Sequence, residues 1–311
     1  MRKKDLILAL LVVTIWGANF TVIKLGLSGV PSMLLVTLRY IITAFPAVFF
    51  VKKPNVEWKY IIMYGLAVGV LQFACLFYAM EIGMPASLAS IILQMQAFIS
   101  PVFAMFFLKE KLKVKQIAGF MIAAVGLYII GTASGTNGMS EVPKGALLLT
   151  VAAPVFWALS NIVLRFMTDK SNEHGEKLNM LSLIVWSGLI PPLPVLCIAL
   201  MIDTPATLLN AIVNMNGMSI FAVLYLAFCA TLFGYGGWSI LISKYPMSKV
   251  APISLLVPVT GLLTAHIVLH EQLSVRQWSG VIVILVSLAI ANLDLKMIIN
   301  KLKPGEQGNA N

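Results

Sequence analysis

The sequence predicts an all-α integral membrane protein with ten transmembrane helices, arranged as two inverted repeats of five. Three observations support this fold class: an apolar composition, a series of apolar runs long enough to cross a bilayer, and a motif that occurs twice. Hydrophobic residues make up 59% of the 311 residues and charged residues 11%, and the mean hydropathy is +0.93. A soluble globule needs more polar surface than such a composition provides.

Apolar runs of about 18 residues or more, the length that crosses a bilayer as a helix, follow one another along almost the whole chain. We expect membrane spans at 5–27, 31–51, 59–80, 85–108, 113–132, 144–166, 178–200, 217–241, 248–269 and 274–293. The first run is longer than a signal-peptide core and has no small-residue cleavage site, so we assign it as a span. The longest connections, 167–177 and 201–216, are polar and are expected to be too small to fold.

A motif in the first half of the chain returns 161 residues later without a gap. Its first copy runs from Pro85 to Gly119 and its second from Pro246 to Gly280. The identical pairs are Pro85 and Pro246, Ser87 and Ser248, Leu108 and Leu269, Glu110 and Glu271, Leu112 and Leu273, Val114 and Val275, Gln116 and Gln277, and Gly119 and Gly280. Such a run indicates a duplicated gene.

The duplication divides the chain into two halves of five spans each. We expect a first repeat at 1–132, a linker at 133–143, a second repeat at 144–293 and a disordered cytoplasmic tail at 294–311. Because five is odd, the second repeat must enter the membrane in the opposite orientation. Inverted repeats are a recurring design of secondary transporters, in which two similar halves expose a midplane site to each side in turn. Some channels share this symmetry.

The basic residues predict the orientation. With a cytoplasmic N-terminus, eighteen of the 22 lysines and arginines lie on the cytoplasmic side. The other four are Lys144 and Arg276, which face outward, and Lys24 and Arg39, which lie within spans. Because short basic loops stay in the cytoplasm, both termini are expected there. The net charge of +10 is then explained by the basic residues that set the orientation of the chain in the membrane, and it does not indicate nucleic-acid binding.

Several motifs resemble the EamA family of the drug/metabolite transporter superfamily. Trp16-Gly-Ala-Asn-Phe, Leu38-Arg-Tyr and the repeated Pro-x-Ser…Glu-x-Leu unit look like patterns of the whole family. More narrowly, four stretches look like its bacterial exporters of O-acetylserine and cysteine: Gly83-Met-Pro-Ala-Ser, Leu93-Gln-Met-Gln-Ala-Phe, Val185-Trp-Ser-Gly-Leu-Ile-Pro and Ala251-Pro-Ile-Ser-Leu-Leu-Val-Pro-Val.

The resemblance covers about residues 1–293. It implies a basket of five plus five helices in the bacterial plasma (inner) membrane, a central cavity, and export of small amino-acid-like metabolites. The superfamily also carries sugars and nucleotide sugars.

Polar and aromatic side chains at mid-span positions are the candidates for lining a cavity, because a polar group inside a membrane needs a partner or water. Trp16 and Asn19 share one helical face, and so do Trp157 and Asn161. The inverted repeat predicts that these two faces oppose each other. The candidates for substrate contact are Trp16, Asn19, Gln72, Tyr78, Gln94, Trp157, Asn161, Tyr235, Trp238 and Ser254. Each could instead bond a neighbouring helix, a contact worth about 0.6 kcal/mol on average.

Arg39 and His266 are the charged or titratable candidates inside spans. Arg39 lies about 12 Å along the second span, where a cation costs roughly 2.5–3.5 kcal/mol. It either meets a carboxylate of the substrate or of a gate, or it snorkels or binds backbone carbonyls. His266 either couples transport to protons or packs as a structural residue. All twelve acidic residues lie at or beyond span ends, which argues against a mid-membrane carboxylate relay.

Glu110 and Glu271 occupy the same place in the two repeats, at helix C-termini where the helix dipole disfavours a negative charge. Their recurrence suggests a structural clamp. We expect each to accept hydrogen bonds from the N-terminal amides of the helix that follows it, the fifth and the tenth span.

No pattern in the sequence predicts an enzyme, a cofactor or a metal site. Cys75, Cys197 and Cys229 lie in apolar runs without metal-like spacing, and phosphate-loop and catalytic-triad motifs are not recognisable. The expected partners are a small-molecule substrate and the lipid bilayer, and the apolar exterior suits either lipid or a second copy in a homodimer. The alternatives to a secondary-active transporter are a passive channel or facilitator and, less favoured, a membrane-embedded enzyme.

Overall fold

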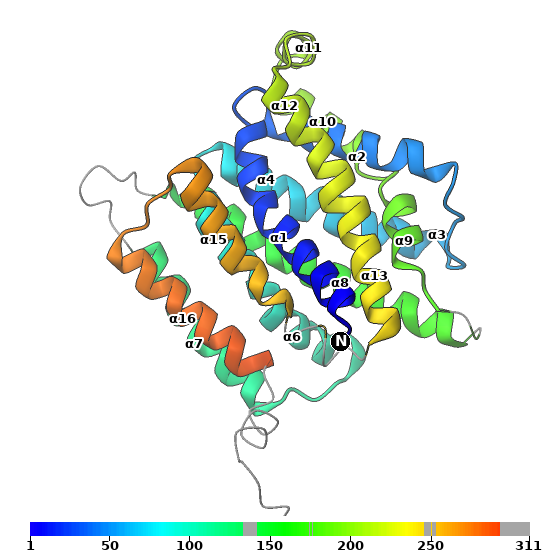
Figure 1. The fold of residues 1–311 in the computed structure, drawn as a ribbon, viewed down its shortest axis with the longest axis vertical. Helices are drawn as coiled ribbons and strands as arrows, with labels where there is room; N and C mark the ends of the chain where they lie inside the picture. Colours follow the sequence, from blue (N-terminus) through cyan, green and yellow to red (C-terminus); the bar gives the residue numbers. More distant parts are fainter. Residues whose placement is uncertain (133–141, 174, 176, 246–249, 251–252, 293–311) are drawn as a thin grey trace, which may run out of the picture.

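The computed structural model describes residues 1–132, 142–173, 175, 177–245, 250 and 253–292, and among these it contains helices and no strand (Figure 1). This confirms the predicted all-helical class for that part of the chain. Most of the predicted linker and all of the predicted tail lie outside the described residues, as do Pro246, Ser248 and Pro252 of the second repeat.

The helices of the first half include two irregular segments, the π-helix η1 and the 3₁₀ turn η2. In chain order they are α1 (Lys3–Gly26), α2 (Ser32–Val48), α3 (Trp58–Tyr64), η1 (Gly65–Gln72), α4 (Phe73–Glu81), α5 (Ala86–Ile92), η2 (Leu93–Met95), α6 (Gln96–Leu108) and α7 (Val114–Gly131).

The second half includes another π-helix, η3. Its elements are α8 (Lys144–Glu173), α9 (Met180–Ser187), α10 (Pro192–Ile202), α11 (Pro205–Val213), α12 (Gly217–Leu224), η3 (Tyr225–Phe233), α13 (Gly234–Lys244), α15 (Leu256–Leu269) and α16 (Val275–Asn292).

Several of these elements join into stretches that are long and apolar enough to cross a membrane. In the described residues there are five such stretches: Lys3–Gly26, Trp58–Glu81, Ala86–Leu108, Lys144–Glu173 and Gly217–Lys244. The pair α9 and α10, bent by 42°, makes a sixth if it is counted as one span. Shorter apolar helices occur at Ser32–Val48, Val114–Ile130, Leu256–Leu269 and Val275–Ala291. The chain is a multi-pass membrane protein.

The bend between α9 and α10 lies at Pro191 and Pro192, where a single helix was predicted over 178–200. Proline has no backbone N–H to donate, and it disfavours the helical conformation of the residue before it. The helix therefore ends at Ser187 and a new one begins at Pro192.

The two connections predicted to be too small to fold are partly helical. Helix α8 continues to Glu173, well beyond the predicted end at residue 166, and Lys170 on this extension forms an ion pair with Glu57. Hydrogen bonds from Lys170 and Lys59 lower the pKa of Glu57 to about 2. In the other connection, Pro205 begins α11 and the Thr204 hydroxyl caps it, a favoured pairing at a helix start.

The two copies of the repeat share their local backbone geometry. Helices α6 and α15 are each followed by a non-glycine residue with positive φ, Lys109 at 56° and His270 at 54°. In both copies the next amide, that of Glu110 or Glu271, donates to the carbonyl oxygen six residues earlier, at 3.3 Å. Figure 1 shows α6 running toward the lower part of the molecule and α15 toward the upper left, so the two copies run in opposite directions.

Glu271 bonds to the other half of the chain. Its Oε1 accepts from the Ala86 amide at 2.7 Å, and its Oε2 accepts from the Ser87 amide at 2.9 Å and the Ser87 hydroxyl at 2.6 Å. The acceptor thus caps the start of α5, and the prediction that it caps the tenth span was wrong.

Glutamine side chains already cap the fifth and tenth spans. Gln116 accepts from the Lys113 amide and Gln277 from the Ser274 amide, both at 2.9 Å. The prediction for Glu110 was therefore also wrong: its side chain is exposed and lies 3.7 Å from Arg165 on α8.

Paired glycines let helices approach closely at two crossings. Where α7 packs along α16, a Cβ on Gly280 would lie 2.7 Å from the Gly126 carbonyl oxygen. Where α1 packs along α15, a Cβ on Gly17 would lie 2.7 Å from the Gly261 amide nitrogen. Both close approaches are possible only because glycine has no side chain, and small residues are common at contacts between membrane helices.

We expect Glu271→Ala to destabilise the protein by about 2 kcal/mol or more, because it removes three hydrogen bonds to a charged acceptor. The measurement is the apparent melting temperature of the detergent-solubilised protein. Glu110→Ala is the matched control at the equivalent position of the first repeat, where an exposed ion pair is worth under about 1 kcal/mol. An equal fall in melting temperature in the two variants would contradict a stabilising contact between Glu271 and the start of α5.

We expect Gly280→Ala to destabilise the protein by about 1–3 kcal/mol, because the added methyl group overpacks the contact with α7. Gly236→Ala is the control, since a Cβ there meets nothing within 4 Å and alanine is the better helix former. Thermal unfolding of both variants in the same detergent tests this. A Gly280→Ala protein as stable as wild type would show that α7 and α16 can separate without cost.

Candidate functional site

A cavity of about 280 Å³ lies between the two halves of the chain. Residues of α1, α2, α3, η1, α4, η2 and α6 line it from the first half. Residues of α8, α9, η3, α13 and α15, together with Ser254, line it from the second half. Because both halves contribute, the wall changes whenever the halves move relative to each other.

The structure brings together nearly all of the side chains predicted to line a cavity. Those that border it are Trp16, Asn19, Gln72, Gln94, Trp157, Asn161, Tyr235, Trp238 and Ser254. The predicted faces of α1 and α8 therefore meet around one space. Tyr78 is not among the lining residues and packs against the hydrophobic core. It lies six residues after Gln72, which puts the two on different sides of a regular helix.

Gln96 and Tyr64 also border the cavity and were not among the predicted contacts. Gln94 and Gln96 would point to different faces of an α-helix, but the 3₁₀ turn η2 ends between them and changes their angular spacing. Tyr64 lies where α3 passes into η1. In the sequence it is one aromatic residue among many in an apolar run, so no signal distinguishes it from a core residue.

An aromatic group forms one part of the wall. The Trp16 ring centre lies 5.4 Å from that of Tyr235 and 5.3 Å from that of Trp238. The Trp16 indole Nε1 donates to the Ala230 carbonyl oxygen in η3 at 3.0 Å. These contacts fix the ring faces that a solute would meet.

An amide group forms another part. The Asn161 Nδ2 on α8 donates to Gln96 Oε1 at 2.9 Å and to the Ser100 hydroxyl at 3.0 Å, both on α6. These bonds join a helix of each half and hold two polar side chains at the cavity.

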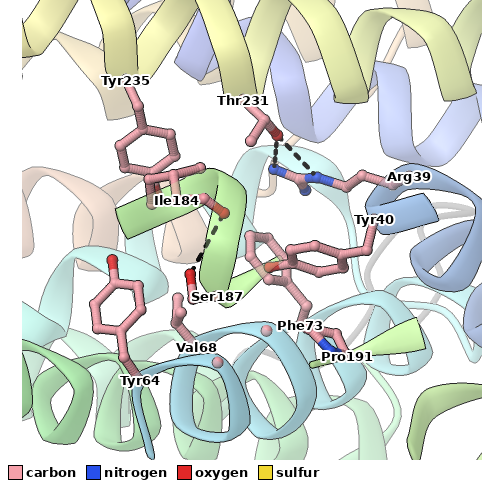
Figure 2. Close-up of a pocket in the computed structure, with 12 residues that line it drawn as sticks. Arg39, Tyr40, Tyr64, Val68, Phe73, Ile184, Ser187, Pro191, Thr231 and Tyr235 are labelled. Atoms are coloured by element: carbon pink, nitrogen blue, oxygen red, sulfur yellow. Dashed lines mark hydrogen bonds between the residues drawn. The ribbon is translucent and has the colours of Figure 1, made fainter. Parts of the chain in front are cut away.

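Arg39 borders the same cavity and does not snorkel, since it is 4% exposed. Its Nε and Nη2 donate to the Thr231 hydroxyl at 3.3 and 3.0 Å, and its Cζ lies 4.3 Å from the centre of the Phe73 ring (Figure 2). These two hydrogen bonds thus go to a hydroxyl group, in place of the backbone carbonyls considered from the sequence. Arg39 also borders a smaller side pocket with Tyr40 and Tyr64.

The π-helix η3 positions two of these contacts. The Thr231 hydroxyl, which accepts from Arg39, donates in turn to the Leu226 carbonyl oxygen at 2.7 Å. The Ala230 carbonyl, one residue earlier, accepts from Trp16. Single stretches of π-helix are frequent at functional sites because they redirect side chains and backbone groups.

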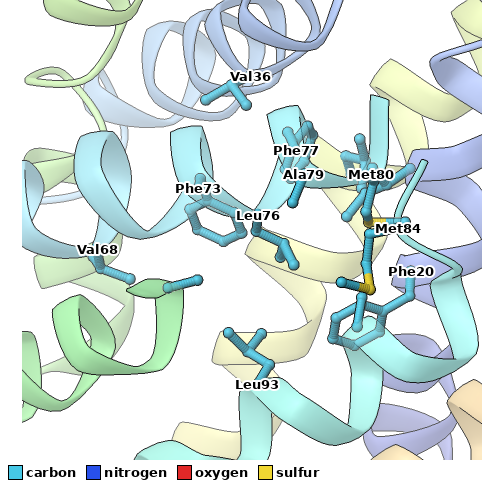
Figure 3. Close-up of a cluster of buried hydrophobic side chains, with 14 of the residues drawn as sticks. Phe20, Val36, Val68, Phe73, Leu76, Phe77, Ala79, Met80, Met84 and Leu93 are labelled. Atoms are coloured by element: carbon cyan, nitrogen blue, oxygen red, sulfur yellow. The ribbon is translucent and has the colours of Figure 1, made fainter. Parts of the chain in front are cut away.

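The apolar part of the wall is the surface of the hydrophobic core. Phe20, Phe73, Leu76 and Leu93 border the cavity and belong to the large buried cluster around α4 shown in Figure 3. The cavity is therefore supported by close packing on one side and by amide and aromatic groups on the others.

His266 lies away from the cavity. It is exposed on α15, and its Nδ1 lies 3.0 Å from the Glu271 carbonyl oxygen. In the described residues no group of three or more His, Cys, Asp or Glu side chains could hold a metal ion. The cavity lining described by the structure contains no Asp or Glu.

A solved structure, titled only as the crystal structure of a protein, is similar in fold. Its TM-score to this chain is 0.61 at 15% sequence identity, and the match covers 97% of this chain and 100% of that one. At this identity the likeness concerns the fold alone.

Two curated bacterial proteins are similar over nearly the full length. Those of Escherichia coli (strain K12) and Salmonella typhimurium are 41% and 42% identical over 290 residues, covering 93% of this chain and 95% of each relative. Both are named "Probable amino-acid metabolite efflux pump". An "Uncharacterized transporter" of Archaeoglobus fulgidus is 27% identical over 284 residues, 89% of this chain and 94% of its own.

The model of the EamA-like transporter family matches two stretches of the sequence, residues 3–132 and 144–293. These stretches include all of the residues described above as lining the cavity. The chain belongs to the EamA-like transporter family.

Proposed function

We propose that this transporter is a secondary-active carrier of the bacterial plasma membrane that exports small amino acids or related metabolites, such as cysteine or O-acetylserine, by alternating access. The observation that carries the proposal is the cavity of about 280 Å³ whose wall comes from both halves of the chain. A site at the interface of two repeats can open to either side as the halves rock against each other.

The size and chemistry of the cavity favour a small polar solute. Pockets for drug-sized ligands measure about 300–1,000 Å³, so this cavity suits a metabolite at or below the lower end of that range. Amide and aromatic side chains line it, and the curated relatives carry names that refer to amino-acid metabolites. These points support an amino acid over a lipid or a large drug.

The proposed topology has ten spans and both termini in the cytoplasm. It counts the five long stretches, the bent pair α9 and α10 and the four shorter apolar helices as one span each. In this topology, eighteen of the 22 lysines and arginines lie on the cytoplasmic side, in keeping with the preference of positive charge for that side.

Proteoliposomes loaded with a panel of labelled amino acids, with and without a pH gradient, test the proposal. A carrier gives saturable flux and counterflow, whereas a channel gives flux that does not saturate. A response to the pH gradient identifies proton coupling, and trans-stimulation identifies exchange. Absence of counterflow for every amino acid in the panel would overturn the proposal.

We expect Trp16→Ala and Asn161→Ala to abolish counterflow, because each removes a side chain that shapes the cavity and holds its neighbours by hydrogen bonds. Trp278→Ala and Asn210→Ala are matched controls on exposed positions of α16 and α11, and both should transport as wild type. Insertion is checked by the yield of folded protein from membranes. Wild-type flux in both cavity variants would remove these residues from the transport path.

We expect saturating O-acetyl-L-serine to change the tryptophan fluorescence of a variant in which Trp58, Trp186 and Trp278 are replaced by Phe. The three remaining tryptophans border the cavity, so a bound solute alters their surroundings. The complementary variant, in which Trp16, Trp157 and Trp238 are replaced by Phe, should give no change. A signal of equal size in both variants would place the solute elsewhere.

A further inference from the structure

Arg39 carries a positive charge that no acidic side chain balances in the part of the chain that the structure describes. It is 4% exposed, and the ion pairs among the described residues do not include it. Thr231 occupies its Nε and Nη2, while Nη1 has no hydrogen-bond partner. A buried donor of this kind, at the wall of a cavity, is matched by an anionic acceptor.

A second buried group at the same cavity is a hydrogen-bond acceptor that lacks a donor. The Asn19 Oδ1 on α1 has no hydrogen-bond partner, and the residue is 9% exposed. Asn19 borders the cavity together with Arg39. Two residues that line one space therefore each carry a buried, unsatisfied polar atom: a donor on the cation Arg39 and an acceptor on the neutral amide Asn19.

The unpaired donor of Arg39 and the unpaired acceptor of Asn19 are complementary to the carboxylate and the ammonium group of an α-amino acid. A carboxylate accepts hydrogen bonds from a guanidinium, with which its planar geometry is complementary. An ammonium group donates to an amide oxygen and is attracted to the faces of aromatic rings such as Trp16 and Tyr235, which border the cavity. An amine without a carboxylate would leave Arg39 unbalanced, and a carboxylate without an amine would leave Asn19 unsatisfied.

We propose that Arg39 binds the carboxylate of a zwitterionic α-amino acid through its free Nη1, and that Asn19 Oδ1 accepts a hydrogen bond from the ammonium group of the same molecule. Thr231 is the positioning residue that orients the guanidinium. This inference rests on the proposed function and names the part of the substrate that the site selects. The side chain of the amino acid is left to the rest of the wall, so solutes with different side chains share the same anchor.

Isothermal titration of the detergent-solubilised full-length protein under reducing conditions tests the proposal with L-cysteine, cysteamine and N-acetyl-L-cysteine. Cysteamine lacks the carboxylate and N-acetyl-L-cysteine lacks the ammonium group. We expect the wild type to bind L-cysteine about tenfold to a hundredfold more tightly than either analogue, the range for a lost hydrogen bond to a charged group.

The variants separate the two ends of the ligand. Arg39→Gln should weaken L-cysteine binding about tenfold or more and leave cysteamine binding within about twofold. Asn19→Ala should weaken L-cysteine binding and leave N-acetyl-L-cysteine binding unchanged. Arg165→Gln is the matched control, because this arginine lies in an exposed ion pair at the end of α8, and it should bind all three solutes as wild type.

Two results would overturn the inference and leave the proposed function standing. One is wild-type protein that binds cysteamine as tightly as L-cysteine, a comparison that needs no variant to fold. The other is an Arg39→Gln protein that binds L-cysteine as wild type or loses both solutes equally. Wild-type protein that binds none of the three solutes, and gives no counterflow with any amino acid, would overturn both.

Discussion

Inside a membrane, every backbone N–H and C=O group must find its partner within the protein, because the lipid offers none. This requirement explains why the described chain consists of helices, and it also explains where the helices depart from regularity. The breaks at η1, η2 and η3 supply lining residues of the cavity. In η3, carbonyl groups gain side-chain donors: Ala230 accepts from Trp16, and Leu226 accepts from Thr231. The irregular backbone segments thus lie at the cavity and form part of its wall.

The duplicated sequence has produced similar local structure and different long-range contacts. In both copies a positive-φ residue and the same backbone bond follow α6 or α15, and both cap the next helix with a glutamine. The glutamates directly after the positive-φ residues nevertheless have different partners. Glu271 reaches the start of α5, whereas Glu110 faces Arg165. Local geometry follows from the sequence of each copy, while the contacts of a polar side chain depend on what the fold places beside it.

Much of the fold was predictable because long apolar runs leave few alternatives to spanning helices. The helices found at Trp58–Glu81 and Ala86–Leu108 agree with the predicted ranges 59–80 and 85–108 within about the usual error of a few residues. The π-segments were not predictable, because Gly65–Gln72 and Tyr225–Phe233 contain the same apolar residues as the helices around them. Helix α11 was missed for a different reason: the signal of Thr204 and Pro205 was present in a stretch assigned to a loop.

The candidate site was predictable to the extent that polar residues in apolar runs must face inward. This rule located Asn19, Gln72 and Asn161 at the cavity and failed for Tyr78, whose ring is apolar enough to pack in the core. It could not identify the partner of Glu271, because Ala86 lies 185 residues away in sequence. Contacts across such a separation depend on how the halves pack, which no local pattern records.

The carboxylate of Glu271 holds three donors at the start of α5 at once. While it does so, the helix that precedes it and the helix it caps are constrained to shift together, although they belong to different repeats. Separating that end of the molecule breaks all three bonds, which share one charged acceptor group. Any rearrangement that moves one repeat against the other at this end must therefore first overcome a cross-link made by a single side chain.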